Sequence, residues 1–277
     1  MGFASVMVYV DDVDSTDSRI ALACDLAELF DAQLIGVSAS VPVVSSVEPY
    51  PGGVRVSNGL IEEQKLAEEE IKRAAGRFRS VAAARHPNLL WRAGVDDPEE
   101  FTARQARRAD LIILGPDSRW PRLRNAVDPG DVLMAAGRPV LVAPPNAALK
   151  PMLAHILIGW KDCREARRAV GDSLPLLGKA GKITVMEIAE ETEDAGHGRP
   201  VDDVVEFIRL HGMSATAVAM PSNGQSAGDQ LLAYAEANGV GLIVLGGYGH
   251  ARPREWIFGG VTSTLLQKSP ICCLFSH

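Results

Sequence analysis

Two hydrophobic patterns alternate along the chain. Short runs of Val, Ile and Leu, such as 4–10, 110–115 and 241–246, are separated by segments such as 15–30, where apolar residues recur at helical spacing. Continuous apolar runs are typical of strands buried on both faces of a parallel sheet. Apolar residues three or four positions apart predict amphipathic helices. The chain is therefore expected to form an α/β fold, with helices covering a parallel sheet.

Applied to the whole chain, these patterns give a regular alternation of elements. The expected strands are 4–10, 34–38, 89–92, 110–115, 139–143, 154–160, 182–188, 214–219, 241–246 and 271–275. The expected helices are 15–30, 60–85, 98–108, 126–136, 164–178, 200–211, 225–238 and 260–268. Ser15 or Asp14 is expected to cap the first helix, and Pro98 to stand at the first position of another.

Landmarks in the first part of the chain return in the second part. Gly115 and Gly246 each end an apolar run and lie 131 residues apart (246 − 115); Pro139 and Pro270 have the same spacing (270 − 139). A constant offset at two separate landmarks indicates an internal repeat.

The beginnings of the two copies also match, at a different offset. The segments 5–14 and 155–164 are similar, and Asp11 and Lys161 lie 150 residues apart (161 − 11). The first copy therefore holds about 19 extra residues (150 − 131), which the Pro-, Gly- and Ser-rich stretch 41–59 explains as a loop.

Each copy has the elements of a small doubly wound domain. We expect two tandem five-stranded parallel-sheet domains, at 1–146 and 151–277, with a linker at 144–152. The last strand of each copy would leave an unpaired edge. Pairing Val140 to Ala143 with Ile271 to Phe275 would cover both edges and pack the two domains as a pseudo-dimer.

Composition and charge narrow the function classes. The 277 residues are 47% hydrophobic and carry a net charge of −7, with 16 basic and 21 acidic residues in 1–149. A folded core is expected, and a cationic surface for nucleic acid is not. No apolar run approaches the length of a membrane span, and the first residues lack the pattern of a signal peptide. The cysteines Cys24, Cys163, Cys272 and Cys273 form no C-x-x-C pair, which favours free thiols in the cytoplasm.

A glycine constellation in the second copy carries the candidate chemistry. The run 241–246 ends in Gly246, Gly249 follows three residues later, and Gly259-Gly260 open the next helix. Glycines after a strand, followed by a helix amino end, suit the approach of an anion such as a phosphate. In the first copy the corresponding segment is Asp128-Pro129-Gly130-Asp131, where a proline removes one donor and two carboxylates repel phosphate.

This spacing of glycines, with a helix and a short last strand after it, resembles the universal stress protein family over both copies. The resemblance implies strand order 3-2-1-4-5 and, in the second copy, a site for ATP or a related adenine nucleotide, with Mg²⁺ as its companion ion. It implies phosphate contacts at Gly246, Gly249, Gly259, Gly260, Val261 and Thr262. It places adenine and ribose at Gly159, Lys161, Ile188, Leu245 and Tyr248.

Two positions depart from the family pattern. Gly260 stands where a Ser or Thr is usual, and Thr262 is the nearest residue that could supply the hydroxyl. Lys161 stands where an Asp is usual, with Asp162 adjacent, while the first copy keeps the acid as Asp11.

The remaining chemistry of the sequence is weak. There is no P-loop, no G-x-S-x-G elbow, and no pair of histidines at metal-ligand spacing among His86, His155, His197, His211, His250 and His277, so no catalytic or metal residue is assigned. Asp11, Asp12 and Asp14 are interpreted as helix-end residues rather than metal ligands, and Cys163 as a structural cysteine.

Three functions remain open from the sequence. The first is a stress-response sensor or regulator that binds an adenine nucleotide in the second copy and acts on an unidentified protein partner. The second is an interaction scaffold without a ligand, and the third is a slow ATP hydrolase, for which no general base stands out. The sequence leaves open whether the chain also forms a homodimer.

Overall fold

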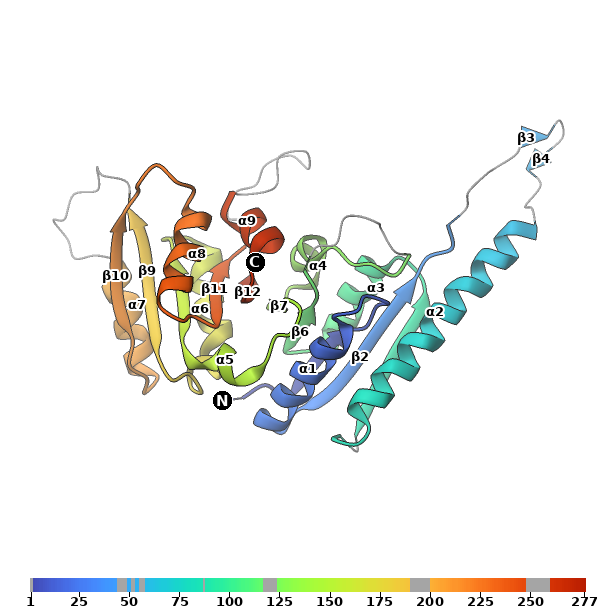
Figure 1. Ribbon diagram of the computed structural model, residues 1–277, viewed down its shortest axis with the longest axis horizontal. Coiled ribbons are helices and arrows are strands. Elements are labelled where there is room, and N and C mark those ends of the chain that lie inside the picture. The colour runs from blue at the N-terminus through green and yellow to red at the C-terminus, as the bar shows by residue number, and fades with distance from the viewer. Residues whose placement is uncertain are drawn as a thin grey trace.

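The structure is a computed structural model that describes residues 2–43, 49–50, 53–54, 58–86, 88–116, 124–189, 200–247 and 260–277. A ten-stranded sheet crosses the molecule, and helices flank it (Figure 1). Its order is β10-β9-β8-β11-β12-β7-β6-β1-β2-β5, so that residues before and after the middle of the chain each build half of it.

The first half has the predicted alternation of strands and helices. Its elements are β1 (Ser5–Tyr9), α1 (Thr16–Phe30), β2 (Gln33–Ser40), β3 (Pro49–Tyr50), β4 (Gly53–Val54), α2 (Asn58–Ala82), β5 (Leu89–Val95), α3 (Pro98–Gln105), a short 3-10 turn (Ala106–Arg108), β6 (Leu111–Leu114), α4 (Pro129–Ala136) and β7 (Val140–Val142). The order β5-β2-β1-β6-β7 is the predicted order 3-2-1-4-5. The expected loop at 41–59 is not wholly a loop, because β3 and β4 pair as a separate ribbon and α2 begins inside the predicted range.

The second half repeats this arrangement. Its elements are α5 (Leu149–Ala154), β8 (Ile156–Trp160), α6 (Arg164–Leu177), β9 (Ile183–Ala189), α7 (Pro200–Leu210), β10 (Thr216–Pro221), α8 (Ala227–Ala237), β11 (Leu242–Gly246), α9 (Gly260–Lys268) and β12 (Cys272–Ser276). The order β10-β9-β8-β11-β12 is again 3-2-1-4-5, with parallel pairing throughout.

Helix α5 was not predicted, because the expected linker 144–152 covers most of it. The carbonyl of Leu153 accepts from the amide of Gly181 at 2.9 Å, and Pro151 lies close against Gly241. Met152 and Leu153 are buried. The helix therefore packs beneath the second half, while the division at 146 and 151 stays a prediction.

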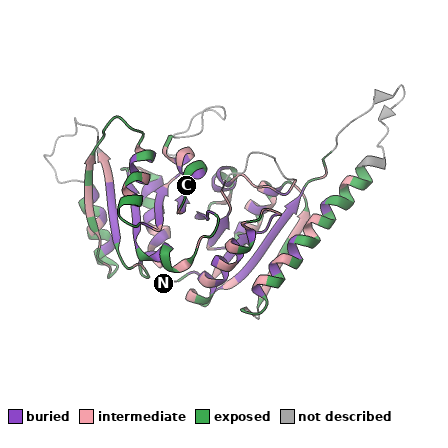
Figure 2. Cartoon of the chain, in the orientation of Figure 1, coloured by how far each residue is buried: buried purple, intermediate pink, exposed green. Residues whose placement is uncertain are grey.

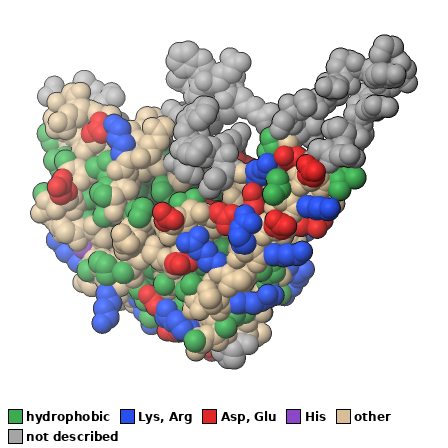
Figure 3. All heavy atoms as spheres, turned by 45° about the vertical axis from the view of Figure 1, so that its right-hand side comes forward, with side chains coloured by type: hydrophobic (Ala, Val, Ile, Leu, Met, Phe, Trp, Pro, Cys, Tyr) green, Lys and Arg blue, Asp and Glu red, His purple; other side chains and the backbone are tan. Residues whose placement is uncertain are grey.

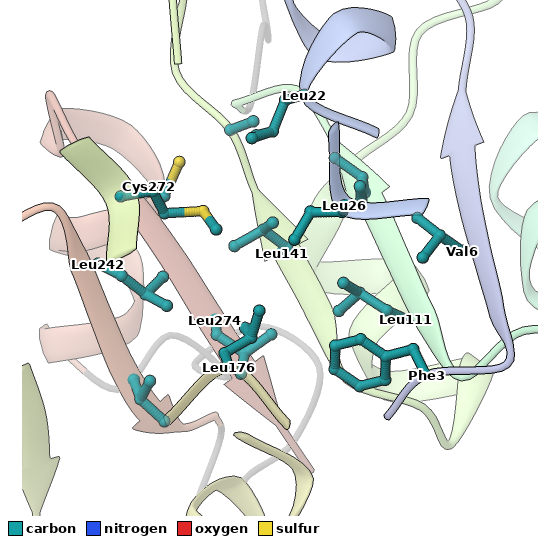
Figure 4. Close-up of a cluster of buried hydrophobic side chains, with 14 of the residues drawn as sticks. Phe3, Val6, Leu22, Leu26, Leu111, Leu141, Leu176, Leu242, Cys272 and Leu274 are labelled. Atoms are coloured by element: carbon teal, nitrogen blue, oxygen red, sulfur yellow. The ribbon is translucent and has the colours of Figure 1, made fainter. Parts of the chain in front are cut away.

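The two halves join edge to edge through their last strands. β12 pairs antiparallel with β7, with Phe275 opposite Val140 and Cys273 opposite Val142. This confirms the expected pairing of the two edges. Side chains of both halves, among them Leu141 and Leu274, lie in one buried cluster at the junction (Figure 4).

The sheet register corrects one detail of the repeat. Ile112 and Ile243 are 131 residues apart (243 − 112), but their partners on the last strands, Val140 and Cys273, are 133 apart (273 − 140). The matched prolines therefore do not occupy equivalent positions, because the last strand is shifted by two residues between the copies.

The central strands are buried (Figure 2), and neighbouring residues such as Val6 and Met7 belong to two different buried clusters, so the core lies on both faces of the sheet, as the continuous apolar runs predicted. Cys272 belongs to one buried cluster and Cys273 to the other, so the adjacent cysteines point to opposite faces of the sheet. Burial raises the pKa of both thiols to about 12, and that of Cys24 to about 11. These cysteines are protonated core residues at neutral pH.

The surface that Figure 3 shows mixes acidic and basic side chains. They pair between α1 and α2, as in Arg77 with Asp17, and between α1 and the turn after α2, as in Arg85 with Asp25, each at 2.5 Å. No helix in the described part of the chain is long and apolar enough to cross a bilayer.

Candidate functional site

The predicted adenine and ribose residues gather at the carboxyl edge of the second half. Gly159 pairs with Leu245 across β8 and β11, and Trp160 pairs with Glu187 on β9, one residue before Ile188. Lys161 follows β8 directly and is exposed. This edge is the point where strand order reverses between β8 and β11, which is where doubly wound sheets bind ligands.

The amino end of α9 supplies the described part of the predicted phosphate site. α9 follows β11 in the chain and begins at Gly260, which is exposed, while Thr262 is buried. Among the described residues, a Cβ built on Gly260 would meet no atom within 4 Å. The first amides of a helix have no partner within the helix, so this end carries N–H donors that its own turns do not use. Tyr248, Gly249 and Gly259 lie outside the described residues.

Close packing explains why a glycine stands at Gly246, in addition to the predicted contact with phosphate. A Cβ built on it would lie 2.5 Å from the amide nitrogen of Ala166 and 2.8 Å from the Cβ of Glu165. The first turn of α6 therefore rests directly on the end of β11. A glycine is needed there whether or not a ligand is present.

Gly159 is likewise in close contact on one face. A Cβ on it would collide with Leu245 and lie 3.2 Å from Leu231 of α8. The family resemblance placed Gly159 among the adenine and ribose residues. The structure fills this face of Gly159 with core side chains, so only the carboxyl edge of β8 is left for such a contact.

Glu165 is a site residue that sequence reasoning missed. It is 6% exposed, stands in the first turn of α6 beside Gly246, and accepts from Arg164 at 2.9 and 3.0 Å. Burial acts to raise its pKa, but hydrogen bonds from its own backbone amide, Arg164 and Cys163 outweigh burial and hold the pKa below its usual value. A carboxylate therefore lies at the candidate site, opposite in charge to exposed Lys161.

In the first half, side chains of that half occupy the corresponding carboxyl edge of the sheet. Arg19 of α1 is 2% exposed and lies against Gly115, where a Cβ would collide with its guanidinium. It donates to Asp11 at 2.7 Å, to the carbonyl of Tyr9 at 3.0 Å and to Thr16 at 2.9 Å. Asp11 also accepts from the Thr16 hydroxyl. Asp11 is therefore tied to a buried cation rather than to a metal.

Tyr9 occupies the position that Gly159 holds in the second half. Its hydroxyl lies 3.0 Å from the carbonyl of Ala39 and 2.9 Å from that of Asn125. Burial raises the pKa of Tyr9 far above its usual value, and the hydrogen bond to Ala39 offsets this only in part. The phenol is thus a neutral, fixed part of the first half.

The amino ends of α4 and α9, the matching helices of the two halves, also differ in what occupies them. Asp128 caps α4 and accepts from the amide of Gly130 at 2.7 Å, and Pro129 has no amide hydrogen. The carboxylate of Asp128 therefore occupies the amino end of α4, the part of a helix that attracts anions. Ser15 is the N-cap of α1, as predicted, although its side chain makes no cap hydrogen bond.

The remaining candidates carry structural contacts. His155 is buried between the Asn238 carbonyl at 3.0 Å and the Thr184 hydroxyl at 2.9 Å. Asp162 pairs with Arg167 at 2.5 Å. His197, His250, Arg252 and Arg254 lie outside the described residues. Within the described ranges, no group of three or more His, Cys, Asp or Glu could hold a metal ion.

Two doubly wound α/β domains in one chain, joined through their last strands, define the class of this protein. Among solved structures, a universal stress protein from Archaeoglobus fulgidus DSM 4304 superposes with a TM-score of 0.70 over 99% of this chain and 96% of its own, at 15% identity. A functionally unknown protein from Pseudomonas aeruginosa PAO1 reaches a TM-score of 0.56 over 99% and 92%, also at 15% identity. Neither a protein-family model nor a curated protein matches the sequence. The chain has the fold of a tandem universal stress protein, as its glycine pattern predicted.

Proposed function

We propose that this protein is a cytoplasmic stress-response sensor or regulator that binds one adenine nucleotide, ATP, at the carboxyl edge of its second half. Phosphates would contact the amino end of α9 at Gly260, Val261 and Thr262, together with Gly246, Gly249 and Gly259. Adenine and ribose would lie along Gly159, Lys161, Ile188, Leu245 and Tyr248. Binding of the nucleotide would change how the protein binds its protein partner.

The observation that carries this proposal is the contrast between the two corresponding helix ends. The amino end of α4 is closed by the carboxylate of Asp128 and by Pro129, whereas α9 begins at Gly260, which is exposed and whose Cβ position no described side chain approaches. A helix amino end at a switch point attracts anions through its free amides and dipole. Exposed Lys161 adds a positive charge at the same edge.

The ionised Glu165 gives Mg²⁺ a role in this proposal. A buried carboxylate beside Gly246 disfavours bare phosphates by like-charge repulsion. Mg²⁺ binds phosphate and carboxylate oxygens together, so it would offset that repulsion.

Gly260 offers a matched pair of variants for the test. Gly260→Asp puts a carboxylate in the first turn of α9, one position after the one that matches Asp128 at α4, and an acid there does not harm the helix. Gly260→Ser restores the residue type usual in the resembling family. Isothermal titration with ATP and Mg²⁺ should show one site per chain, weakened at least about 10-fold by Gly260→Asp. Gly260→Ser should bind at least as tightly as the original protein. Equal binding by both variants would contradict the assignment.

A ligand-free scaffold is the second candidate, and a specific observation favours it. Packing against α6 explains Gly246, and packing against Leu245 and Leu231 explains Gly159, without any nucleotide. This function predicts no heat of binding at millimolar ATP in the original protein or in Gly260→Ser. The same titration therefore separates the two functions.

A further inference from the structure

Gly247, the residue directly after β11, contacts Ser276 and His277 of the second half and lies close to Leu133 of the first half. Its amide donates to the carbonyl of Ser276 at 2.8 Å, and its carbonyl oxygen lies 3.1 Å from Nδ1 of His277. A Cβ built on Gly247 would lie 2.5 Å from Cδ2 of Leu133, a residue of α4 in the first half. Gly247 is itself buried.

The hydrogen bonds define what each partner does. A carbonyl oxygen only accepts, so Nδ1 of His277 must carry the hydrogen in this contact. The Gly247 amide is already used by Ser276, so Gly247 is not a donor to a ligand. Its backbone is a fixed point from which the chain leaves β11 toward the glycine segment and α9.

We propose that Leu133 and His277 are positioning residues for the nucleotide site of the second half, acting through the backbone of Gly247. The proposal rests on the function proposed above. Leu133 is 2% exposed and shares one buried cluster with Leu265 of α9 and Phe275 of β12. Figure 1 places α4 and α9 on either side of the β7–β12 junction. A side chain of the first half therefore packs against Gly247, and it belongs to the same buried cluster as a residue of α9.

This arrangement gives the first half a role although its own edge is filled. Its helix α4 begins at a carboxylate cap, which occupies the helix end where an anion could bind. A leucine of the same helix packs against Gly247. A binding site needs its backbone held to within about 0.5 Å. The first half is therefore part of the second half's site.

The test measures ATP affinity in the full chain with Mg²⁺ present. Leu133→Ala should weaken ATP binding about 5- to 10-fold, the size of a typical coupling between sites. Leu133→Met fills the same space and should restore affinity. The matched control is Leu34→Ala, a fully buried leucine of β2, which should unfold at lower urea concentration yet bind ATP unchanged.

Two further comparisons distinguish a specific loss of ATP binding from a general loss of folding. One is a double variant at Gly247 and Leu133, and the other is a conservative exchange at His277. Gly247→Ala should weaken binding in the original background and less so together with Leu133→Ala, because the smaller residue removes the collision. His277→Phe should weaken binding several-fold, and His277→Asn should recover it, since its side-chain amide can donate in place of Nδ1.

The outcomes distinguish the two proposals. Absence of ATP binding in the original protein contradicts the proposed function and this inference together. Binding that is normal in the original protein, in Leu133→Ala and in His277→Phe contradicts the inference alone. Loss in those two variants with recovery in Leu133→Met and His277→Asn supports it.

Discussion

The two carboxyl edges of this protein are built on the same strands but treated in opposite ways. In the first half, Arg19 and Tyr9 fill the edge and Asp128 closes the helix end. In the second, the helix begins at an exposed glycine whose Cβ position no described side chain approaches, and Lys161 is exposed. A buried, hydrogen-bonded polar network makes an edge rigid, whereas free amides at a helix end can bind an anion. The difference shows that the same strand arrangement carries a filled edge in one copy and an edge with an exposed helix start in the other.

The largest expected effect comes from breaking the polar network of the first half. Arg19→Met leaves the buried carboxylate of Asp11 without its cation, and removing one partner of a buried pair costs about 3–5 kcal/mol. Urea unfolding of the ligand-free protein measures this loss. The control is Arg167→Met, whose partner Asp162 is exposed, and which should cost below about 1 kcal/mol. Similar losses in the two variants would show that the first edge is not a structural core.

The next largest effect is a difference in stability between variants of Gly246 and of Gly260 in the second half. Gly246→Ala pushes a methyl group into the first turn of α6, and overpacking of this kind costs about 1–3 kcal/mol. Gly260→Ala enters open space and should be neutral or slightly stabilising. Thermal unfolding of the two ligand-free variants, side by side, checks this difference. Equal destabilisation would contradict the open helix end.

A smaller effect is expected at the helix cap of the first half. Asp128→Ala removes the bond to the Gly130 amide and should cost about 1 kcal/mol, as helix caps do. It should not create a second ATP site, because Arg19 and Tyr9 still fill the edge. Counting bound nucleotides by native mass spectrometry tests this, and two nucleotides per chain would be the contrary result.

The smallest effect is a pH dependence at Glu165. Its pKa in the folded protein lies below its usual value, so its carboxylate stabilises the fold above the pKa of the unfolded chain, about 4.3, and this contribution is lost as the pH falls. Glu165→Gln should therefore be less stable than the original protein at pH 7, and the gap should close in acid. Urea midpoints measured from pH 7 to pH 3 test the sign, and a gap that widens in acid would refute it.

Much of the fold follows from the sequence, because buried parallel strands and amphipathic helices leave strong local patterns. The edge pairing of β7 with β12 also follows, since two unpaired last strands had to be covered. Helix α5 was missed because Pro151 and the prolines before it resemble a linker, while tertiary packing under Gly181 and Gly241 makes the helix stable.

The site was harder to predict, because its decisive contacts join residues far apart. Arg19 lies on the apolar face of a predicted helix, eight residues after Asp11, and this pattern could have indicated a buried ion pair. The contact of Gly247 with Leu133 joins the two halves and leaves no local signal. Which glycines serve packing and which serve a ligand depends on neighbours that spacing alone does not specify.

The most direct test of the account is the number of ATP molecules bound per chain, measured by native mass spectrometry with Mg²⁺ in the original protein and in Gly260→Asp. The account predicts one nucleotide in the original protein and none in the variant at the same ATP concentration. No nucleotide in the original protein, two per chain, or one that persists in Gly260→Asp would contradict the claim that the second edge alone binds a ligand.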